Sequence, residues 1–490
     1  MGRPDYTSRT GFIDHTPREE EGMNKGLIAA AAAVALAGVA VVGGAAVTGS
    51  QAMKKIQGAP AQWQAQWPLM KVVDQKYQKS LFSATHTLTL SFGCGATTDN
   101  PITIRQTIQH GPLPGFKTLA AAVIDTEIVV PDNEKKAVAA LIGSDKSPFT
   151  AHTVVGFGGA TSTSFSIPSM NFNAPTGEKV AWQGLSGDVK QGGGKILYDV
   201  ASPGFSFSGK DEKSTVDMKL AALRIHGEMG DSAGSFWLRP GTGEFELVSL
   251  DMNATSSAQP GMPPMKVALS QLKASAENKL EGELLSNTGK FSAKGTVNDV
   301  RVDKMELQAS IKRIHAPTYQ RFIQRVIDTS TAACDMKQPV SPQVLMGQMQ
   351  QDFAALLPHN PEYALDKLAV EIDGKRGEMS YSVGVAGATA ADAQLPLMAL
   401  LMTKGQLRGE AKLPSLWVEK MLGRFGGGPQ GAQADPAAQA EMANVMITKF
   451  VNDGYLVKDG EMLASKISFE KGQLTVNGKA ITPPGAPPQQ

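Results

Sequence analysis

The feature that most constrains the fold of this chain is a long series of short segments in which apolar and polar residues alternate. In 85–92, the threonines and leucines fall on opposite faces of an extended chain, as in a half-solvated strand. Loops containing Gly, Pro, Asn, Asp or Ser separate the segments, which is typical of successive antiparallel strands. The same pattern predicts strands at 102–109, 121–130, 149–156, 161–167, 180–190, 195–200, 215–227 and 243–253.

No long helical segment separates these strands. Because a parallel pair needs a crossover, usually a helix, we expect an antiparallel sheet with one solvated face wherever polar residues alternate. Further strands are predicted at 265–275, 279–285, 290–298, 304–314, 365–372, 378–386, 463–470 and 473–476, the last two joined by a hairpin turn at Lys471-Gly472.

Helical periodicity is restricted to a few segments. It predicts helices at 53–80, interrupted by Pro60 and Pro68, and at 318–332, 342–356, 391–402, 414–424 and 436–451. The predicted fold class is therefore α+β, dominated by antiparallel β-sheet with accessory helices and preceded by one transmembrane helix.

That transmembrane helix is predicted from the apolar segment Leu27–Val47. No ionisable side chain lies between Lys25 and Lys54, and the apolar run is long enough to cross a bilayer. We favour an uncleaved signal anchor, while Ser50-Gln51-Ala52 leaves cleavage after Ala52 as an alternative. Either way, we expect the rest of the chain to lie outside the cytoplasm, in the periplasm. Met23 is an alternative start of the chain.

Composition shifts divide the chain into regions. We predict a disordered polar extension at 1–22, the signal anchor at 23–52, a mainly antiparallel β region at 53–315 and a mixed α+β region at 316–480. A Gly/Pro/Ala-rich linker is expected near 426–436 and a disordered tail at 481–490.

Charge and cysteine content exclude some partners. The 490 residues include 47 basic and 46 acidic side chains, a formal net charge of +1, so we expect no nucleic-acid partner. The two cysteines, Cys94 and Cys334, are too few to form a zinc site. They either form one disulfide in an oxidising compartment or remain two separate buried thiols.

The strongest catalytic candidate is Ser232, within Gly230-Asp231-Ser232-Ala233-Gly234. This GxSxG pattern matches a hydrolase nucleophile elbow, which requires a strand before the serine and a helix after it. The residues that follow resemble another strand, so we favour a hairpin loop.

Other motifs give no better support for catalysis. Ser270 and Lys273 have SxxK spacing within a predicted strand, and the glycines of 156–159 join two predicted strands without a phosphate-binding helix. The seven histidines show no metal-ligand spacing. We therefore predict no enzymatic activity, no cofactor, no metal, and no catalytic residues.

Several stretches resemble landmarks of the YdgA-type family of Gram-negative bacterial proteins of unknown function. They are Met23-Asn24-Lys25 with the apolar span, Tyr77–Ser83, Ile108–Gly115 with its His-Gly-Pro motif, Trp182–Gly187 and Leu474–Lys479. The resemblance extends from Met23 to Ala480. The polar extension before Met23 and the insertion near Gly426 depart from it. The resemblance implies an inner-membrane anchor, a periplasmic body and no established activity.

The His-Gly-Pro motif of this family begins at His110. From the residues themselves we interpret it as a turn, in which Gly111 supplies permissive dihedral angles and Pro112 and Pro114 fix φ. The His110 imidazole is expected to cap a neighbouring carbonyl group.

The resulting hypothesis is a single-pass inner-membrane protein that acts by non-catalytic binding or scaffolding in the cell envelope. One version has the curved apolar face of the sheet holding a lipid or the edge of another protein, with the Met-rich helix 342–356 as an adaptable surface. The alternatives are a periplasmic serine hydrolase that uses Ser232 and an architectural homo-oligomer.

Overall fold

The computed structural model describes residues 70–481, apart from 93–100, 175–176, 211–213, 232–237, 257–263, 299, 335–341 and 420–435. The predicted polar extension 1–22, the anchor segment Leu27–Val47 and the predicted tail after Ile481 lie outside the described residues. None of the helices within the described ranges combines the length and the apolar character needed to cross a bilayer.

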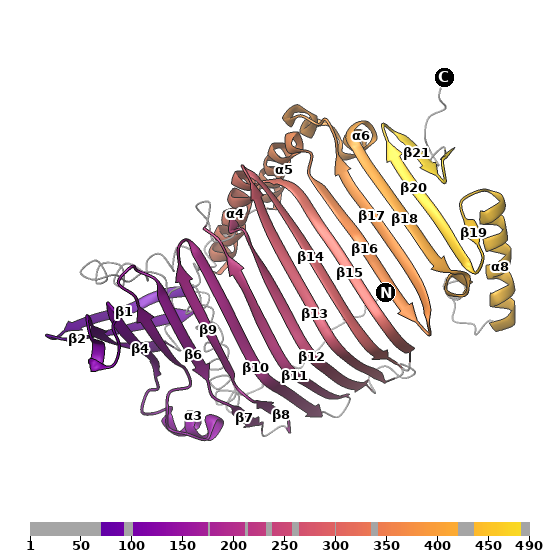
Figure 1. Ribbon diagram of the computed structural model, residues 1–490. Coiled ribbons are helices and arrows are strands. Elements are labelled where there is room, and N and C mark those ends of the chain that lie inside the picture. Colours follow the sequence, from indigo (N-terminus) through magenta and orange to yellow (C-terminus); the bar gives the residue numbers. More distant parts are fainter. Residues whose placement is uncertain are drawn as a thin grey trace, which may run out of the picture.

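All the described strands belong to one antiparallel sheet (Figure 1). They are β1 (Met70–Lys79), β2 (Ser83–Phe92), β3 (Ile102–His110), β4 (Ala122–Val129), β5 (Thr150–Val155), β6 (Thr161–Ile167), β7 (Met170–Asn173), β8 (Lys179–Trp182), β9 (Leu185–Gly192), β10 (Lys195–Lys210), β11 (Ser214–Met229), β12 (Gly241–Ser256), β13 (Met265–Glu281), β14 (Leu284–Val297), β15 (Val300–His315), β16 (Glu362–Ile372), β17 (Lys375–Val385), β18 (Gly405–Pro414), β19 (Val457–Asp459), β20 (Met462–Glu470), β21 (Gln473–Val476) and β22 (Lys479–Ile481).

The connectivity is that of a meander. Most strands pair with the next one along the chain, whereas β6 pairs with β9, and the β7–β8 hairpin pairs through β8 with the second half of β10. At the other end β18 pairs with β20. Sequential pairing needs no crossover helix, so the prediction of an antiparallel sheet is confirmed.

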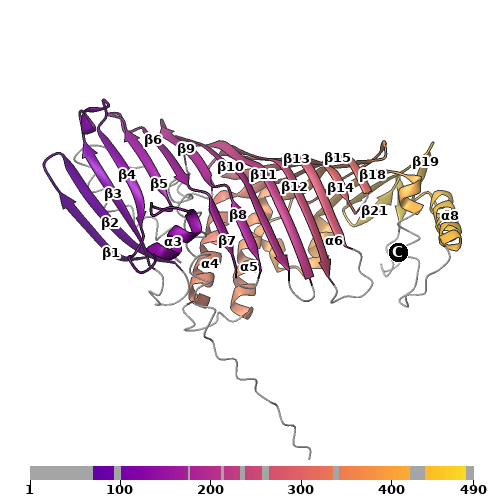
Figure 2. The same ribbon diagram turned by 90° about the horizontal axis from the view of Figure 1, so that it is seen from below.

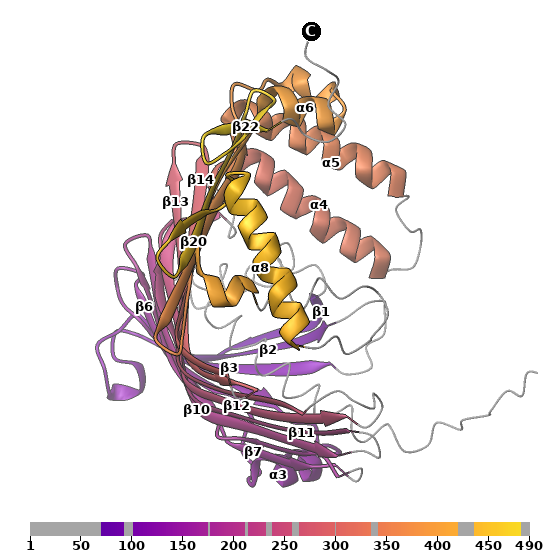
Figure 3. The ribbon, with the colours of Figure 1, turned by 90° about the vertical axis from the view of Figure 1, so that its right-hand side faces the viewer.

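The longer helices lie on one side of the sheet. They are α4 (Ala316–Cys334), α5 (Pro342–Leu356), α6 (Leu397–Lys404) and α8 (Pro436–Asn452), and Figures 2 and 3 show the sheet curving toward them. We call the face on this side the inner face and the opposite face the outer face. The remaining helices are η1 (Pro114–Phe116), α3 (Lys135–Ile142), which is as long as α6, η3 (Leu357–His359) and η4 (Ala390–Gln394).

The inner face is buried in the first strands, beneath α4 and in one cluster of the central strands, formed by Leu247, Leu272 and Ala293. In the first strands Leu88, Leu90 and Ile104 form one buried cluster, and Ile142 of α3 joins another with Phe149. Leu285 of β14 packs with Ala316 and Tyr319 of α4, which places that helix on the inner face. The sheet therefore supports several separate hydrophobic clusters instead of one central core.

The predicted helix over 53–80 is wrong where it can be examined, because Met70–Lys79 is strand β1. A bulge between Val72 and Asp74 shifts the register of this strand against β2. Because of the shift, Val72 and Tyr77 pair with the buried Leu90 and His86 of β2. The helical pattern instead relied on Val73, between Met70 and Tyr77, and Val73 is exposed.

Other boundaries also differ from the prediction. The segment 180–190 is two strands, β8 and β9, because Gly184 adopts φ +88° between them. The segment 279–285 contains the β13–β14 turn at Gly282, and Pro396 separates η4 from α6 within 391–402. Strands β7, β18, β19 and β22 and helix α3 were not predicted at all.

The predicted division at residue 316 falls inside the continuous sheet. Strand β15 lies before this position and β16 after it, and the two pair along Val302–Lys312. The two predicted regions therefore share one sheet, and their separate domain status stays a prediction.

Candidate functional site

The inner face carries an unbroken apolar row across the long central strands. From β10 to β17, each member lies directly opposite the next in the neighbouring strand, so their side chains project from the same face. We call this the apolar row, and it consists of Val200, Ile225, Phe245, Ala274, Phe291, Leu307, Leu368 and Met379. Alternation places these residues together, because each strand contributes every second side chain.

Three members of this row are open to solvent, and the other five are half-buried. Ile225, Leu307 and Met379 are 38%, 37% and 37% exposed, although each is flanked by apolar neighbours on both sides. Isolated exposed apolar residues are common on protein surfaces, but these three belong to one continuous apolar row, which indicates a contact surface.

A lane of small residues runs beside the apolar row. Its members are also opposite one another in successive strands: Gly227, Gly243, Ala276, Gly289 and Ala309. A Cβ atom added at Gly289 would have no atom closer than 4.0 Å. The lane therefore has free space at Gly289 and is bordered by the larger side chains of the apolar row.

Tyr198 of β10 lies at one end of the lane. Its phenol oxygen would be 2.8 Å from a Cβ atom placed on Gly243, so the side chain extends along the lane from its own strand. Burial raises the pKa of the Tyr198 phenol above its usual value of 10.0. The phenol therefore remains a neutral hydrogen-bonding group at the end of an apolar channel.

Helices cover one margin of the inner face. Besides the contact of α4 with Leu285, Arg325 of α4 forms an ion pair with the buried Asp352 of α5, which joins the two helices. At the other end of β17, Trp417 lies against Gly377. The apolar row lies between these covered margins.

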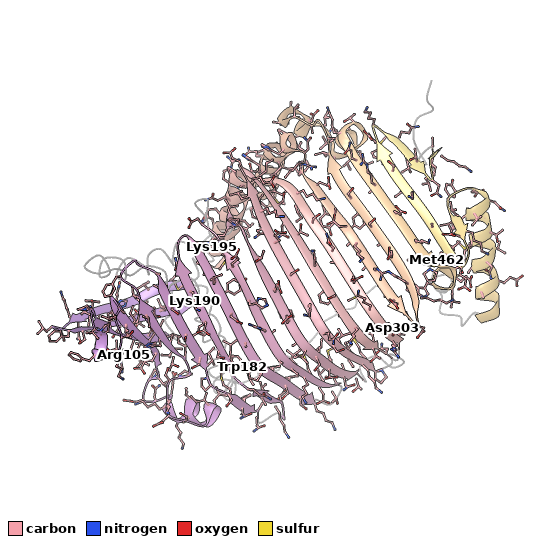
Figure 4. All side chains as sticks on the ribbon, in the orientation of Figure 1. Arg105, Trp182, Lys190, Lys195, Asp303 and Met462 are labelled. Atoms are coloured by element: carbon pink, nitrogen blue, oxygen red, sulfur yellow. The ribbon has the colours of Figure 1, made fainter. Side chains whose placement is uncertain are left out.

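The outer face is charged, and its charges are paired across strands. Arg224 donates two hydrogen bonds to Asp199, at 2.9 and 2.6 Å, and Lys273 donates one to Glu246 at 2.7 Å. Figure 4 shows the side chains of this face, including that of Lys190. Shallow depressions on it are lined by such ion pairs, for example around Lys273 and Glu306. The prediction of one polar face is confirmed.

Glu306 is the most perturbed carboxyl group of this face. Hydrogen bonds from Lys304 and Lys367 lower the pKa of Glu306 from 4.5 to about 2, and Arg376 also lies 3.2 Å from it. Because these partners neutralise the carboxylate, we assign this cluster to surface stabilisation rather than to acid–base chemistry.

The described structure gives no support to the predicted catalytic candidates. Ser232 lies outside the described residues, and the strands on either side of its segment are β11 and β12, which form an antiparallel pair. Ser270 is in β13 as predicted, while the Lys273 ammonium group is bonded to Glu246. The glycines of 156–159 join β5 to β6, also as predicted.

His110 ends β3, and the turn after it differs in detail from the interpretation. Its Nε2 is buried and has no hydrogen-bond partner among the described residues, so it caps no carbonyl group through that atom. Gly111 is required by space rather than by its dihedral angles, since a Cβ atom there would overlap the Ala120 carbonyl oxygen. The left-handed φ occurs later, at Gly115 and Phe116.

The histidines and cysteines form no metal site in the residues that the structure covers. No three His, Cys, Asp or Glu side chains converge there as ligands. His86 is buried between Gln75 and Gln106, with hydrogen bonds of 3.0 and 2.8 Å, and burial lowers the pKa of its imidazole. Cys94 and the side chain of Cys334 lie outside the described residues, so their pairing stays a prediction.

The fold and this site define a β-sheet protein with one apolar and one charged surface. The chain belongs to the bacterial family described as "Bacterial protein of unknown function (DUF945)", whose model matches residues 23–484. No curated protein and no solved structure matches the chain. The predicted membership of a bacterial family of unknown function is confirmed.

Proposed function

We propose that this protein is a non-catalytic binding protein of the bacterial cell envelope, and that its inner sheet face binds lipid acyl chains. In this proposal Leu27–Val47 anchors the chain in the inner membrane and the sheet lies in the periplasm. The observation that carries the proposal is the continuous apolar row from Val200 to Met379, of which Ile225, Leu307 and Met379 are more than one third exposed.

The shape and chemistry of the inner face favour a long apolar ligand. An acyl chain offers no hydrogen-bonding groups, and the apolar row and lane present none along most of their length. The gain from removing apolar surface from water is about 25 cal/mol per Å², so affinity accumulates along an extended contact. A compact polar ligand would gain little on this surface.

A matched pair of substitutions tests the proposal. Leu307 projects from the inner face of β15, and Gln308, the next residue, projects from the outer face between Lys290 and Lys367. Leu307→Glu places a carboxylate in the acyl-chain path, while Gln308→Glu adds the same charge on the other side of the same strand.

Both variants and the unaltered chain are purified from a Gram-negative host in one detergent, and bound lipid is quantified by mass spectrometry. Lipid held around the anchor segment is common to all three, so differences report on the sheet. We expect Leu307→Glu to lose lipid and Gln308→Glu to retain it. Equal lipid content in both variants would exclude the inner face as the binding site.

A further inference from the structure

Three neighbouring turns at the β1 end of the sheet form an exposed apolar tip. They connect β1 to β2, β3 to β4 and β5 to β6, and Figure 1 places these strands together at the indigo end of the molecule. Backbone hydrogen bonds connect the turns, from His110 N to Phe82 O at 2.9 Å and from Ala121 N to Val155 O at 2.8 Å. We call these turns, residues 80–82, 111–121 and 156–160, the apolar tip.

The apolar tip carries large hydrophobic side chains that point into solvent. Phe116, Leu81 and Phe82 are 93%, 84% and 76% exposed. The others are Leu113, Leu119 and Phe157. Such exposure is costly in water when it is clustered, so the cluster indicates a surface that is covered in the working protein.

Other turns of the same sheet have the opposite character. The β13–β14, β16–β17 and β20–β21 turns contain Gly282-Glu283, Asp373-Gly374 and Lys471-Gly472, which are ordinary polar hairpin residues. A connection of two polar residues would therefore suffice for sheet formation. The hydrophobic side chains of the apolar tip are not explained by the fold.

The local backbone holds these side chains outward. The Phe116 amide donates to the Leu113 carbonyl at 3.0 Å, and Phe116 adopts φ +58°, a conformation that bulky residues rarely adopt. Ala120 and Pro114 are buried beneath the same turn, and Gly111 lacks a side chain where the Ala120 carbonyl approaches. The His-Gly-Pro motif thus builds a rigid support for an exposed phenylalanine.

We infer that the apolar tip docks onto the surface of a phospholipid bilayer. Its three turns contain no Asp or Glu, while Lys117 lies within the tip and Lys79 at its edge, both exposed. Phe and Leu side chains that enter the acyl boundary beside Lys groups near lipid phosphates are typical of interfacial membrane contacts. Protruding side chains on separate turns suit a fluid surface better than a fixed protein groove.

This contact does not depend on lipid binding by the inner face, and the two are tested separately. The test places a photo-crosslinking benzophenone amino acid at position 82 or 116 of the full chain. The protein is reconstituted in vesicles of phosphatidylethanolamine and phosphatidylglycerol. Position 248 is the control, because Val248 is also an exposed hydrophobic residue but lies in the middle of β12.

We expect lipid adducts from positions 82 and 116 and no lipid adduct from position 248. With the crosslinker at position 119, the double substitution Phe82→Ser and Phe116→Ser should abolish the lipid adduct while the near-ultraviolet circular dichroism stays unchanged. Adducts between two protein chains at 82 and 116 would instead identify a protein interface. That result, or equal lipid labelling at position 248, would overturn the inference.

Discussion

The first strands and the central strands of the sheet share one topology but differ in how their inner faces are covered. In β2 and β3, Leu88, Leu90 and Ile104 are buried, whereas Ile225 and Leu307 at corresponding inner positions of β11 and β15 are more than one third exposed. Alternation supplies an apolar face in both regions. The central strands bury their own cluster of Leu247, Leu272 and Ala293, so the difference lies in the apolar row beside it, which leaves apolar surface uncovered.

The largest expected effect comes from comparing leucines in the two regions. Leu90→Ala removes a fully buried side chain and should lower the free energy of unfolding by about 2–5 kcal/mol. Leu307→Ala, on the open face, should cost less than about 1 kcal/mol, because a side chain that is partly in water leaves no closed cavity. Denaturant unfolding in detergent measures both.

If Leu307→Ala lowered the free energy of unfolding as much as Leu90→Ala does, the two regions would not differ. The apolar row would then be packed core, and the binding proposal would lose its basis.

A second prediction concerns the lane of small residues. Gly289→Leu fills an open position in the middle of a strand, where glycine is unfavourable, and should raise stability by up to about 1 kcal/mol. The added side chain also blocks the lane, so bound lipid should decrease. Thermal unfolding and lipid quantification are measured on the same samples. Destabilisation by this substitution would show that protein atoms already occupy the lane.

The third prediction concerns the acid dependence of stability in the first strands, which contain the buried His86. Burial lowers the pKa of His86 below 6.5, so the unfolded chain binds this proton before the folded chain does. Its contribution to stability is therefore present above pH 6.5 and is lost as the pH falls through the lower folded pKa. His86→Gln should remove this component of the acid dependence. If His86→Gln left the pH dependence of the unfolding free energy unchanged between pH 6.5 and 5, the imidazole would not be held in a dry site in the folded protein.

The smallest effect is expected on the outer face, at Glu306. Its pKa is lowered from 4.5 to about 2, so its contribution is complete above pH 4.5 and is lost as the pH falls toward 2. Because the cluster is at the surface, Glu306→Gln should cost less than about 1 kcal/mol at neutral pH and change the acid profile only in that window. If Glu306→Gln changed the stability only above pH 4.5, the assignment of this cluster to surface stabilisation by ion pairs would be contradicted.

Much of the sheet was predictable because the alternation is local. Strand β6 and helix α5 were predicted with their observed bounds, and the wet outer face follows from the polar half of each alternating segment. Strand β1 was missed because Met70, Val73 and Tyr77 have helical spacing although Val73 is exposed, and β18 was missed because its Gly405 and Gly409 weaken the strand signal.

The site depends on register, which the sequence does not specify locally. The apolar row exists only because Ile225, Phe245 and Phe291 come to lie side by side through successive pairings. Likewise, the turn at His110 was predicted, but its union with the turns at Phe82 and Phe157 into one tip required the strand order. Exposure of these side chains has no local sequence signal.

The central claim is that lipid acyl chains contact the inner face of the central strands and not the outer one. A photo-crosslinking residue at position 307, compared with one at position 308, tests this directly in the host membrane. We predict lipid adducts from position 307 alone. Adducts from position 308, or from neither position, would contradict the claim.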